Sequence, residues 1–243
     1  MKEHENLYEK IQEILGGAQG KLKVLEQQID MDLQLAYYEC SMKIREERED
    51  EWALEHAKYL YEPGYSSQVK MEILARLASI EKVEAYRYIE ACLDTGEEAI
   101  HDWVLLALNE SRMLLESRFL DESQVFISTG LGGKEEKLRY FVALLSRSNL
   151  DLDKTQKKVI KNEFDFILKK FGAELEELRF SEHIATILLL IPMHLSLSEV
   201  IQEAISECNN YGDFLNADFI VTNVKTLTFT EIKNYLKNKK KAD

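Results

Sequence analysis

The sequence predicts a two-part α+β protein, with a helical domain at residues 1–122 and an α+β domain at residues 123–243. Three observations support this division. Apolar residues recur every three or four positions in the first half, which is the period of one-faced helices. After about Asp121 they gather in short runs of β-branched, aromatic and aliphatic residues, which are typical of strands. The acidic excess also stops there: residues 1–124 hold 14 Lys and Arg against 27 Asp and Glu, whereas residues 125–243 hold 17 of each.

The first half is expected to contain helices joined by connections of only a few residues, which makes neighbouring helices antiparallel. Thr95 and Glu98 have the spacing of a capping box that would begin the last of them. Pro63-Gly64 marks the clearest loop. The expected helices cover residues 2–15, 21–45, 52–61, 69–78, 85–93 and 100–115.

The stretch VEAYRYIEACLDTGEEAIHDWVLLALNES, within residues 50–118, resembles the stacked helix pairs of HEAT-like repeat proteins. The resemblance implies a curved scaffold that holds peptides, proteins or nucleic acid without catalysis. The sequence departs from the family's arginine and aspartate ladder, which Asp94 and Asp102 fit only loosely, and no proline begins a repeat. An ordinary helical bundle without a groove is the alternative. Strands in the first hundred residues would remove the basis for a scaffold.

The second half is expected to begin with a hairpin in which VFIST and KLRYFVALLS flank the turn GLGGKEE. A helix, a second hairpin (ELEELRF and IATILLLIPM), a helix opened by Ser196 and Glu199, the strand DFIVTNV, and a helix opened by Thr228 and Glu231 follow. From Lys137 this order is the ferredoxin-like βαββαβ sandwich, with an extra strand before it and a helix after it. The ATILLLI run predicts a central strand that is buried on both faces, and the helical half is one candidate cover for its second face.

Composition excludes several classes of protein. No apolar run approaches the ~20 residues that cross a bilayer, and the polar start MKEHENLYEK is unlike a signal peptide. Three cysteines, Cys40, Cys92 and Cys208, lie far apart without CxxC spacing, which predicts reduced thiols and a cytoplasmic location. The acidic half would repel nucleic acid and anionic membranes and would favour a basic protein or peptide as partner.

Two weak binding sites are expected in the second half. Backbone amides of the glycine turn and a lysine side chain can hold a phosphate, although a hairpin turn that needs positive φ explains the glycines as well. A basic helix face can contact RNA, or the acidic half of the same molecule, although the solvated side of an amphipathic helix has the same pattern. RNA ranks below protein because the strands lack the aromatic pattern of RNA-recognition domains. The residues are Gly130, Gly132, Gly133, Lys134 and Arg139 for the turn, and Lys154, Lys157, Lys158 and Lys161 for the face.

No pattern of a catalytic or metal site is found in the sequence. Glu98 and His101 have the spacing of half a di-iron site, but no second half follows. The end of the chain, KNYLKNKKKAD, reads as a frayed basic tail. The sequence therefore favours a non-enzymatic adaptor whose acidic helical half holds a protein, with no cofactor and no catalytic residue. The alternative is phosphate, nucleotide or RNA binding by the α+β domain.

Overall fold

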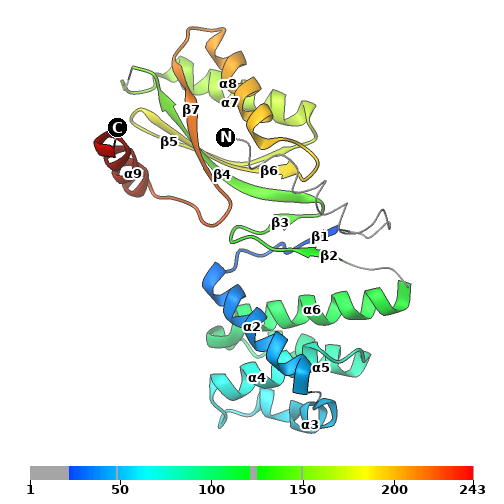
Figure 1. Ribbon diagram of the computed structural model, residues 1–243. Helices are drawn as coiled ribbons and strands as arrows, with labels where there is room; N and C mark the ends of the chain where they lie inside the picture. The colour runs from blue at the N-terminus through cyan, green and yellow to red at the C-terminus, as the bar shows by residue number, and fades with distance from the viewer. Residues whose placement is uncertain (1–21, 48, 121–124, 149, 243) are drawn as a thin grey trace. The chain divides into compact units, whose positions relative to one another are not determined.

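The structure is a computed structural model that describes residues 22–47, 49–120, 125–148 and 150–242 (Figure 1). These residues form two compact units. We call residues 22–25 and 29–127 the helical unit, and residues 26–28 and 128–242 the α+β unit. The expected domain boundary after residue 122 falls at residues 121–124, which lie outside the described part, so it stays a prediction.

The helical unit is built around helix α4. Ile73, Leu74 and Leu77 of this helix have no exposed area, and helices α2, α3, α5 and α6 all pack against it (Figure 1). In the described part of the chain, no helix is long and apolar enough to cross a membrane. The elements of this unit are β1 (Leu22–Val24), α2 (Met31–Glu47), α3 (Asp50–His56), η1 (Ala57–Tyr61), α4 (Ser67–Ala78), α5 (Val83–Leu93), η2 (Glu98–Ile100), α6 (His101–Leu120) and β2 (Val125–Ile127).

The first described residues form a strand where the sequence predicts a helix. β1 pairs in parallel with β2, so that Lys23 lies opposite Phe126. Helix α2 begins only at Met31, because the carboxylate of Asp30 accepts a hydrogen bond of 2.9 Å from the amide of Asp32 and so caps the helix there. The helix expected over residues 21–45 is therefore wrong in its first third. The helix expected over residues 2–15 lies outside the described residues.

Thr95 ends a helix instead of beginning one. Its hydroxyl donates to the carbonyl of Cys92 at 2.8 Å, in the last turn of α5. The next element, η2, has Glu97 before it and no side-chain capping bond. The capping box expected at Thr95 and Glu98 is therefore wrong, because the carbonyls at the end of α5 take the hydroxyl.

The α+β unit confirms the mixed α+β class that the sequence predicts. Two pairs of strands are each followed by a helix, and a last strand and a last helix complete the unit. Its elements are β3 (Gly133–Lys134), β4 (Lys137–Ser146), α7 (Lys154–Lys170), β5 (Glu174–Ser181), β6 (Ile184–Pro192), α8 (Leu197–Asn209), β7 (Leu215–Thr222) and α9 (Phe229–Ala242).

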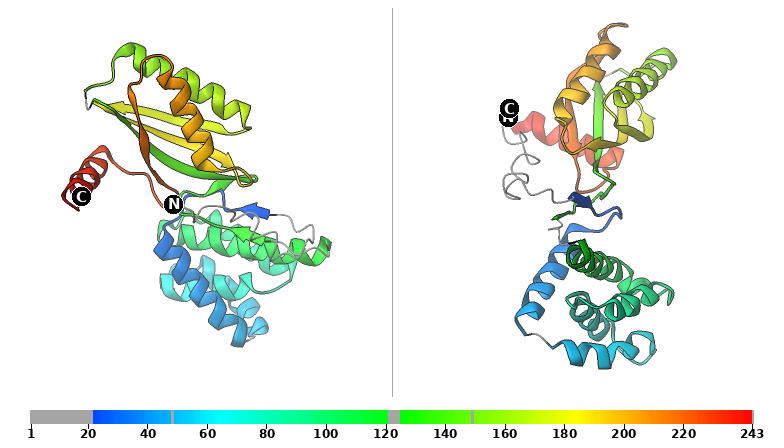
Figure 2. Two further views of the ribbon diagram at one scale, coloured as in Figure 1. Left: turned by 45° about the horizontal axis from the view of Figure 1, so that its top comes forward. Right: turned by 90° about the vertical axis from the view of Figure 1, so that its right-hand side faces the viewer.

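Strand β4 lies inside an antiparallel sheet (Figure 2). Along one side it pairs with β6 over nine residues, from Lys137 opposite Pro192 to Leu145 opposite Ile184. Along the other side it pairs with β3 at its start and with β7 beyond Phe141. β5 forms the outer strand beside β6. β4 and β6 thus supply the buried centre of the sheet.

The two faces of this sheet have different covers. Helices α7 and α8 cover one face, where Ile160, Phe164 and Ile201 are fully buried. On the other face Phe141, Ala143 and Ile184 pack with Ile232 of α9 and with Leu131. The second face of the apolar β6 run therefore has its own cover within the unit. The suggestion that the helical half supplies it is not needed.

The glycine-rich turn does not join two long strands. VFIST contributes β2, which pairs with β1, and β4 instead forms a short hairpin with β3 around Glu135, whose φ is 55°. The expected hairpin is therefore wrong. Gly130 is needed for a close approach, since a Cβ there would lie 1.9 Å from the carbonyl oxygen of Val224.

Helix α9 begins with the capping box that the sequence predicts. The carboxylate of Glu231 accepts from the Thr228 amide at 2.8 Å, and the Thr228 hydroxyl accepts from the Glu231 amide at 3.2 Å. Lys225 also donates to Glu231 at 2.8 Å. The Lys225 ammonium and the Thr228 donors lower the pKa of Glu231 from 4.5 to about 2.

We expect α9 to loosen in acid. The contribution of Glu231 is fully present above its unfolded pKa of 4.5 and is lost as the pH falls toward about 2, because the protonated carboxyl no longer accepts these bonds. Amide protection at residues 229–236, expressed relative to the intrinsic exchange rate at each pH, should fall in acid in the natural chain and be low throughout in Glu231→Gln. The control Glu136→Gln changes an exposed position outside α9 and should give the same amide protection as the natural chain. Protection in α9 that does not change with pH would contradict this role of Glu231.

Candidate functional site

A cavity of about 760 Å³ opens in the α+β unit beside α9, and we call it the α9 cavity. It is bounded by the end of β4, the turn between β5 and β6, the edge strand β7 and helix α9. Its lining combines cationic, polar and apolar side chains. The lining residues are Leu145, Ser146, Arg147, Glu182, His183, Asn216, Asp218, Phe219, Ile220, Val221, Lys233, Tyr235, Leu236, Lys237 and Lys239.

Helix α9 brings its side chains to this cavity because of its period. Ile232 is fully buried on the sheet and Leu236, four residues later, packs in the same cluster. The remaining faces of the helix are left for polar residues. Tyr235 keeps 54% of its surface exposed although it lines the cavity, so its ring is accessible to a ligand.

Positive charge prevails along the cavity. Four cationic side chains line it (Arg147, Lys233, Lys237 and Lys239), against two carboxylates, Glu182 and Asp218. Lys237 and Lys239 have no ion-pair partner among the described residues. The cavity can therefore attract an anion, and two of its cations are available for direct contact.

The turn between β5 and β6 supplies two members of a polar group of three, and α9 supplies the third. Glu182 adopts a φ of 52° there, and its carboxylate receives a 2.8 Å ion pair from Lys233. The same carboxylate oxygen lies 3.9 Å from Nδ1 of His183. The neighbouring Lys233 ammonium holds the pKa of Glu182 below its ordinary value. Glu182 is thus a carboxylate anion beside an imidazole.

The glycine turn lies elsewhere, and its amides are already used. Gly130, Gly132 and Gly133 are buried. The amide of Leu131 donates to the carbonyl of Asn223 at 2.9 Å, and that of Gly132 to Thr129 at 3.0 Å. Phosphate binding at this turn stays a prediction, but the described contacts give the glycines a structural role.

The other residues expected beside the turn hold the sheet together. Arg139 pairs with Glu176 of β5 and donates to the carbonyl of Leu131 at 2.7 Å. Lys134 lies 3.5 Å from the carboxylate of Glu174. Their cationic groups are therefore partly neutralised by carboxylates of β5, which lies beyond β6 in the sheet.

The lysines of α7 stand on a helix face away from the α9 cavity. Lys154, Lys158 and Lys161 are exposed, and in the described part of the chain no ion pair to them is found. Lys157 is half-buried and lies over the ring of Phe180 at 5.8 Å. The basic face exists as a surface, and nucleic-acid contact by it stays a prediction.

The cysteines offer no reactive thiol. Cys92 and Cys208 are buried, Cys40 is half-buried, and all three are free. Burial raises the pKa of the Cys208 thiol to about 12, so it stays protonated at neutral pH. Among the described residues no group of three or more His, Cys, Asp or Glu side chains is placed to hold a metal ion.

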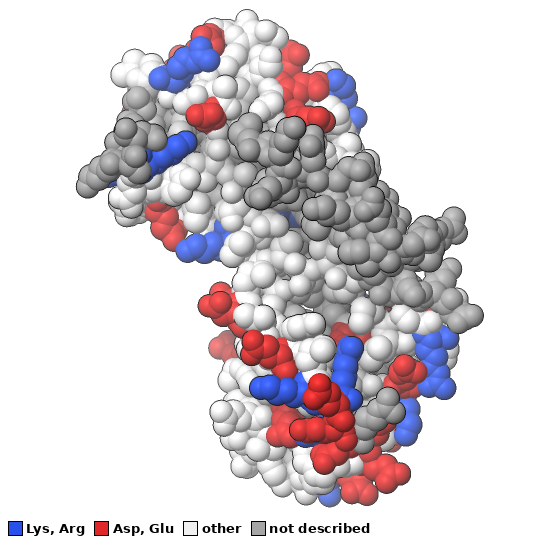
Figure 3. All heavy atoms as spheres, viewed as in Figure 1, with Lys and Arg blue, Asp and Glu red and all other residues white. Residues whose placement is uncertain are grey.

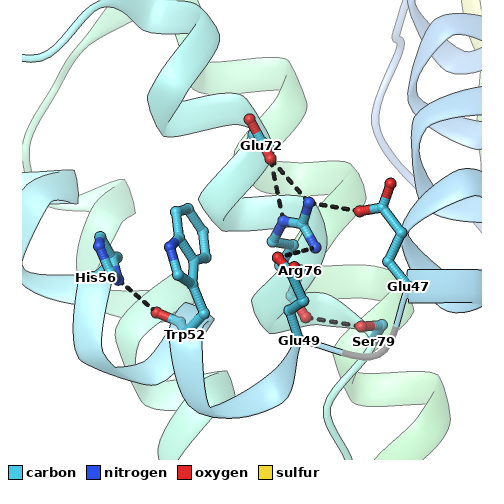
Figure 4. A network of polar contacts seen from close by, with 7 residues as sticks. All are labelled: Glu47, Glu49, Trp52, His56, Glu72, Arg76 and Ser79. Atoms are coloured by element: carbon cyan, nitrogen blue, oxygen red, sulfur yellow. Dashed lines mark hydrogen bonds and ion pairs between the residues drawn. The ribbon is translucent and has the colours of Figure 1, made fainter.

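The acidic residues of the helical unit serve in part as internal ion-pair partners. Figure 3 shows them gathered on its visible face, with Lys and Arg among them. Arg76, only 8% exposed, contacts three carboxylates, with distances of 2.6 Å to Glu47, 3.2 Å to Glu49 and 2.9 Å to Glu72 (Figure 4). Its guanidinium also lies 5.3 Å from the ring of Trp52. This network connects α2, α3 and α4.

We expect Arg76→Ala to destabilise the helical unit by about 1–3 kcal/mol, because it removes several charge-assisted hydrogen bonds and leaves carboxylates facing one another. Chemical denaturation followed by circular dichroism measures this. Arg87→Ala is the matched control, since Arg87 is exposed and pairs only with Glu90 in the described structure. Equal effects of the two substitutions would show that the network has no special role.

Sequence reasoning missed the α9 cavity. It read the last eleven residues as a frayed tail, but Lys233–Ala242 belong to α9, and it gave no role to His183. The available signal was the capping box at Thr228 and Glu231 followed by apolar residues at 232 and 236. That pattern predicts a packed helix whose lysines have fixed positions.

Comparisons with known proteins gave several structural likenesses, among them two transposases. No protein-family model and no curated protein matches the chain. One solved structure, described as a proposed transposase from Deinococcus radiodurans R1, is 17% identical with a TM-score of 0.38, over 44% of this chain and 93% of that one. Another, described as a REP-associated tyrosine transposase bound to a REP hairpin, is 11% identical with a TM-score of 0.32, over 41% of this chain and 61% of that one.

These findings correct two expectations. The matched structures are transposases and not helical-repeat proteins. The helical unit itself packs four helices around α4 and pairs β1 with β2, so the HEAT-like resemblance, with its α-solenoid, is wrong. The adaptor function inferred from it, with a protein held by the acidic half, is contradicted by the same finding. It also loses its structural basis, because β1 is a strand within the first hundred residues. TM-scores below 0.5 do not by themselves assign a fold or an activity to this chain.

Proposed function

We propose that the α+β unit binds nucleic acid in the α9 cavity. The observation that carries this proposal is the row of cationic side chains beside the exposed ring of Tyr235. Nucleic-acid sites without strong sequence preference combine a positive groove along the backbone with aromatic rings on which bases stack. The α9 cavity offers both on one wall, helix α9.

The arrangement favours a polymer over a single phosphate. Lys233 and Lys237 lie four residues apart on one side of α9, about 6 Å along its axis, and Lys239 lines the cavity from another side of the helix. Arg147 lines the cavity at the end of β4, where it pairs with the carboxylate of Asp213. A row of this length can contact successive phosphates, whereas a mononucleotide would engage only part of it.

The charge of the whole chain sets the expected strength. The net charge of −13 repels polyanions at long range. Attraction is confined to the cavity, so binding should depend steeply on salt. Either DNA or RNA satisfies this chemistry; the matched tyrosine transposase is described with a REP hairpin, and that ligand belongs to that structure.

We also infer a ferredoxin-like arrangement for the α+β unit. It is supported by the succession β4-α7-β5-β6-α8-β7 and by the antiparallel order β7-β4-β6-β5. We also propose that the chain has two domains, divided after residue 122, and that it is located in the cytoplasm. The free state of all three cysteines supports that location.

We expect the double substitution Lys237→Gln and Lys239→Gln to weaken binding of a labelled oligonucleotide by the full chain. Two lost phosphate contacts should reduce the slope of log affinity against log salt by about 1.4 for single strands and about 1.8 for duplex. Fluorescence anisotropy between about 50 and 200 mM salt measures it.

The matched control is Lys154→Gln with Lys158→Gln, which removes the same charge from the basic face of α7. It should leave the slope unchanged. A loss of binding in that control alone would move the interface to α7. A natural chain that binds neither single-stranded nor duplex DNA or RNA would refute the proposal.

A second candidate function is phosphodiester cleavage, which the presence of Tyr235 and His183 in one cavity favours. A tyrosine hydroxyl can attack phosphorus and form a covalent intermediate once a neighbouring base takes its proton. The bond to the leaving strand then breaks and releases its hydroxyl end. This reaction would leave the nucleic acid attached to Tyr235.

We expect a labelled oligonucleotide to remain attached to the natural chain in denaturing gels, and Tyr235→Phe to abolish the adduct, because phenylalanine lacks the attacking oxygen. Tyr211→Phe is the matched control, since Tyr211 is exposed in the same unit and does not line the cavity. An oligonucleotide that binds but is never attached or cut would leave the α9 cavity as a binding site alone.

A further inference from the structure

Lys233 differs from the other lysines of the α9 cavity because it already has an anionic partner. Its ammonium pairs with Glu182 at 2.8 Å, whereas Lys237 and Lys239 have no such partner in the described part of the chain. Both members of the pair line the cavity. Their side chains remain 35% and 52% exposed, so an incoming ligand can reach them.

The backbone conformation at Glu182 determines where its side chain starts. Its φ of 52° belongs to the left-handed region, which non-glycine residues seldom adopt. The neighbouring backbone is held by strand pairing of Ser181 with Ile184 and by the bond from the Leu152 amide to the Glu182 carbonyl at 3.1 Å. The backbone thus places Glu182 beside Lys233, and the ion pair holds its carboxylate there.

We propose that Glu182 acts as an internal substitute for a phosphate group, occupying Lys233 in the free protein and lowering the affinity of the α9 cavity for nucleic acid. This inference rests on the proposed nucleic-acid binding at that cavity. A phosphate that binds Lys233 must displace the carboxylate and then remain close to it. Both requirements weaken binding, and both make it more selective for ligands that engage the rest of the row.

The contact has another possible role, because it also ties α9 to the turn between β5 and β6. The two roles predict opposite signs. If Glu182 competes with phosphate, its neutralisation strengthens binding. If the pair is needed to hold α9 in place, neutralisation loosens the helix and weakens binding. The hydrophobic attachment of α9 through Ile232 and its capping box are independent of Glu182, which favours the competitive role.

The test compares the full-length natural chain with Glu182→Gln, which keeps the size of the side chain and removes its charge. The probe is whichever labelled oligonucleotide the natural chain binds most tightly. We expect affinity to rise about two- to five-fold at low salt, the range of an exposed ion pair. The salt slope should steepen by about 0.7 for a single strand or about 0.9 for duplex, which corresponds to one more phosphate contact.

Two further variants make the result specific. Glu177→Gln changes the net charge equally but alters a pair with Arg179 that does not line the cavity, and it should leave affinity unchanged. Adding Lys233→Gln to Glu182→Gln should return the slope to that of the natural chain, because the additional contact is made by Lys233.

Binding by the natural chain with unchanged or weaker binding by Glu182→Gln would overturn this inference and leave the proposed function standing. Equal gains in Glu182→Gln and Glu177→Gln would also overturn it, since net charge alone would then explain the effect. A natural chain that binds no oligonucleotide would refute the proposed function itself.

Discussion

The α+β unit depends on the burial of strand β4 and its neighbour β6 from both sides. Each face of the sheet requires an apolar cover. If Phe141 or Ile187 were exposed to water, the protein would lose the free energy that burial of these side chains provides. Helices α7 and α8 provide one cover and α9 the other. The α9 cavity lies on the side of this second cover, between α9 and β7.

Local signals in the sequence predict the elements of this unit well. The unbroken apolar run of β6 indicates a strand without a solvent face, and all but one of its nine residues are buried. The box at Thr228 and Glu231 marks the start of α9. Prediction of an element fails where its conformation depends on a partner that is distant in the sequence. Leu22, Leu25 and Ile29 suit a helical period, but pairing with β2, a hundred residues later, makes the first of them part of a strand.

The candidate site shows the same limit. Successive glycines and a lysine are compatible both with a phosphate-binding turn and with a close backbone contact. For Gly130 the structure shows the close contact, which is with the carbonyl of Val224. A basic terminal segment is compatible both with a frayed tail and with a packed helix. The segment is a packed helix because Ile232 is buried against the sheet. Which lysines are free for a ligand depends on Glu182, fifty-one residues from Lys233 in sequence. No local pattern contains that information.

Net charge was the least reliable guide to function, and the structure shows why. In the helical unit, Glu110 accepts from Tyr37, Ser41 and Arg45, and Arg76 occupies three further carboxylates. Those acids join helices to one another and are not available to a basic partner. In the α+β unit the charges balance in number, yet Lys237 and Lys239 of α9 have no ion-pair partner among the residues that the structure describes. Binding therefore follows from where charges remain unpaired, and a unit with no net charge can be the one that attracts a polyanion.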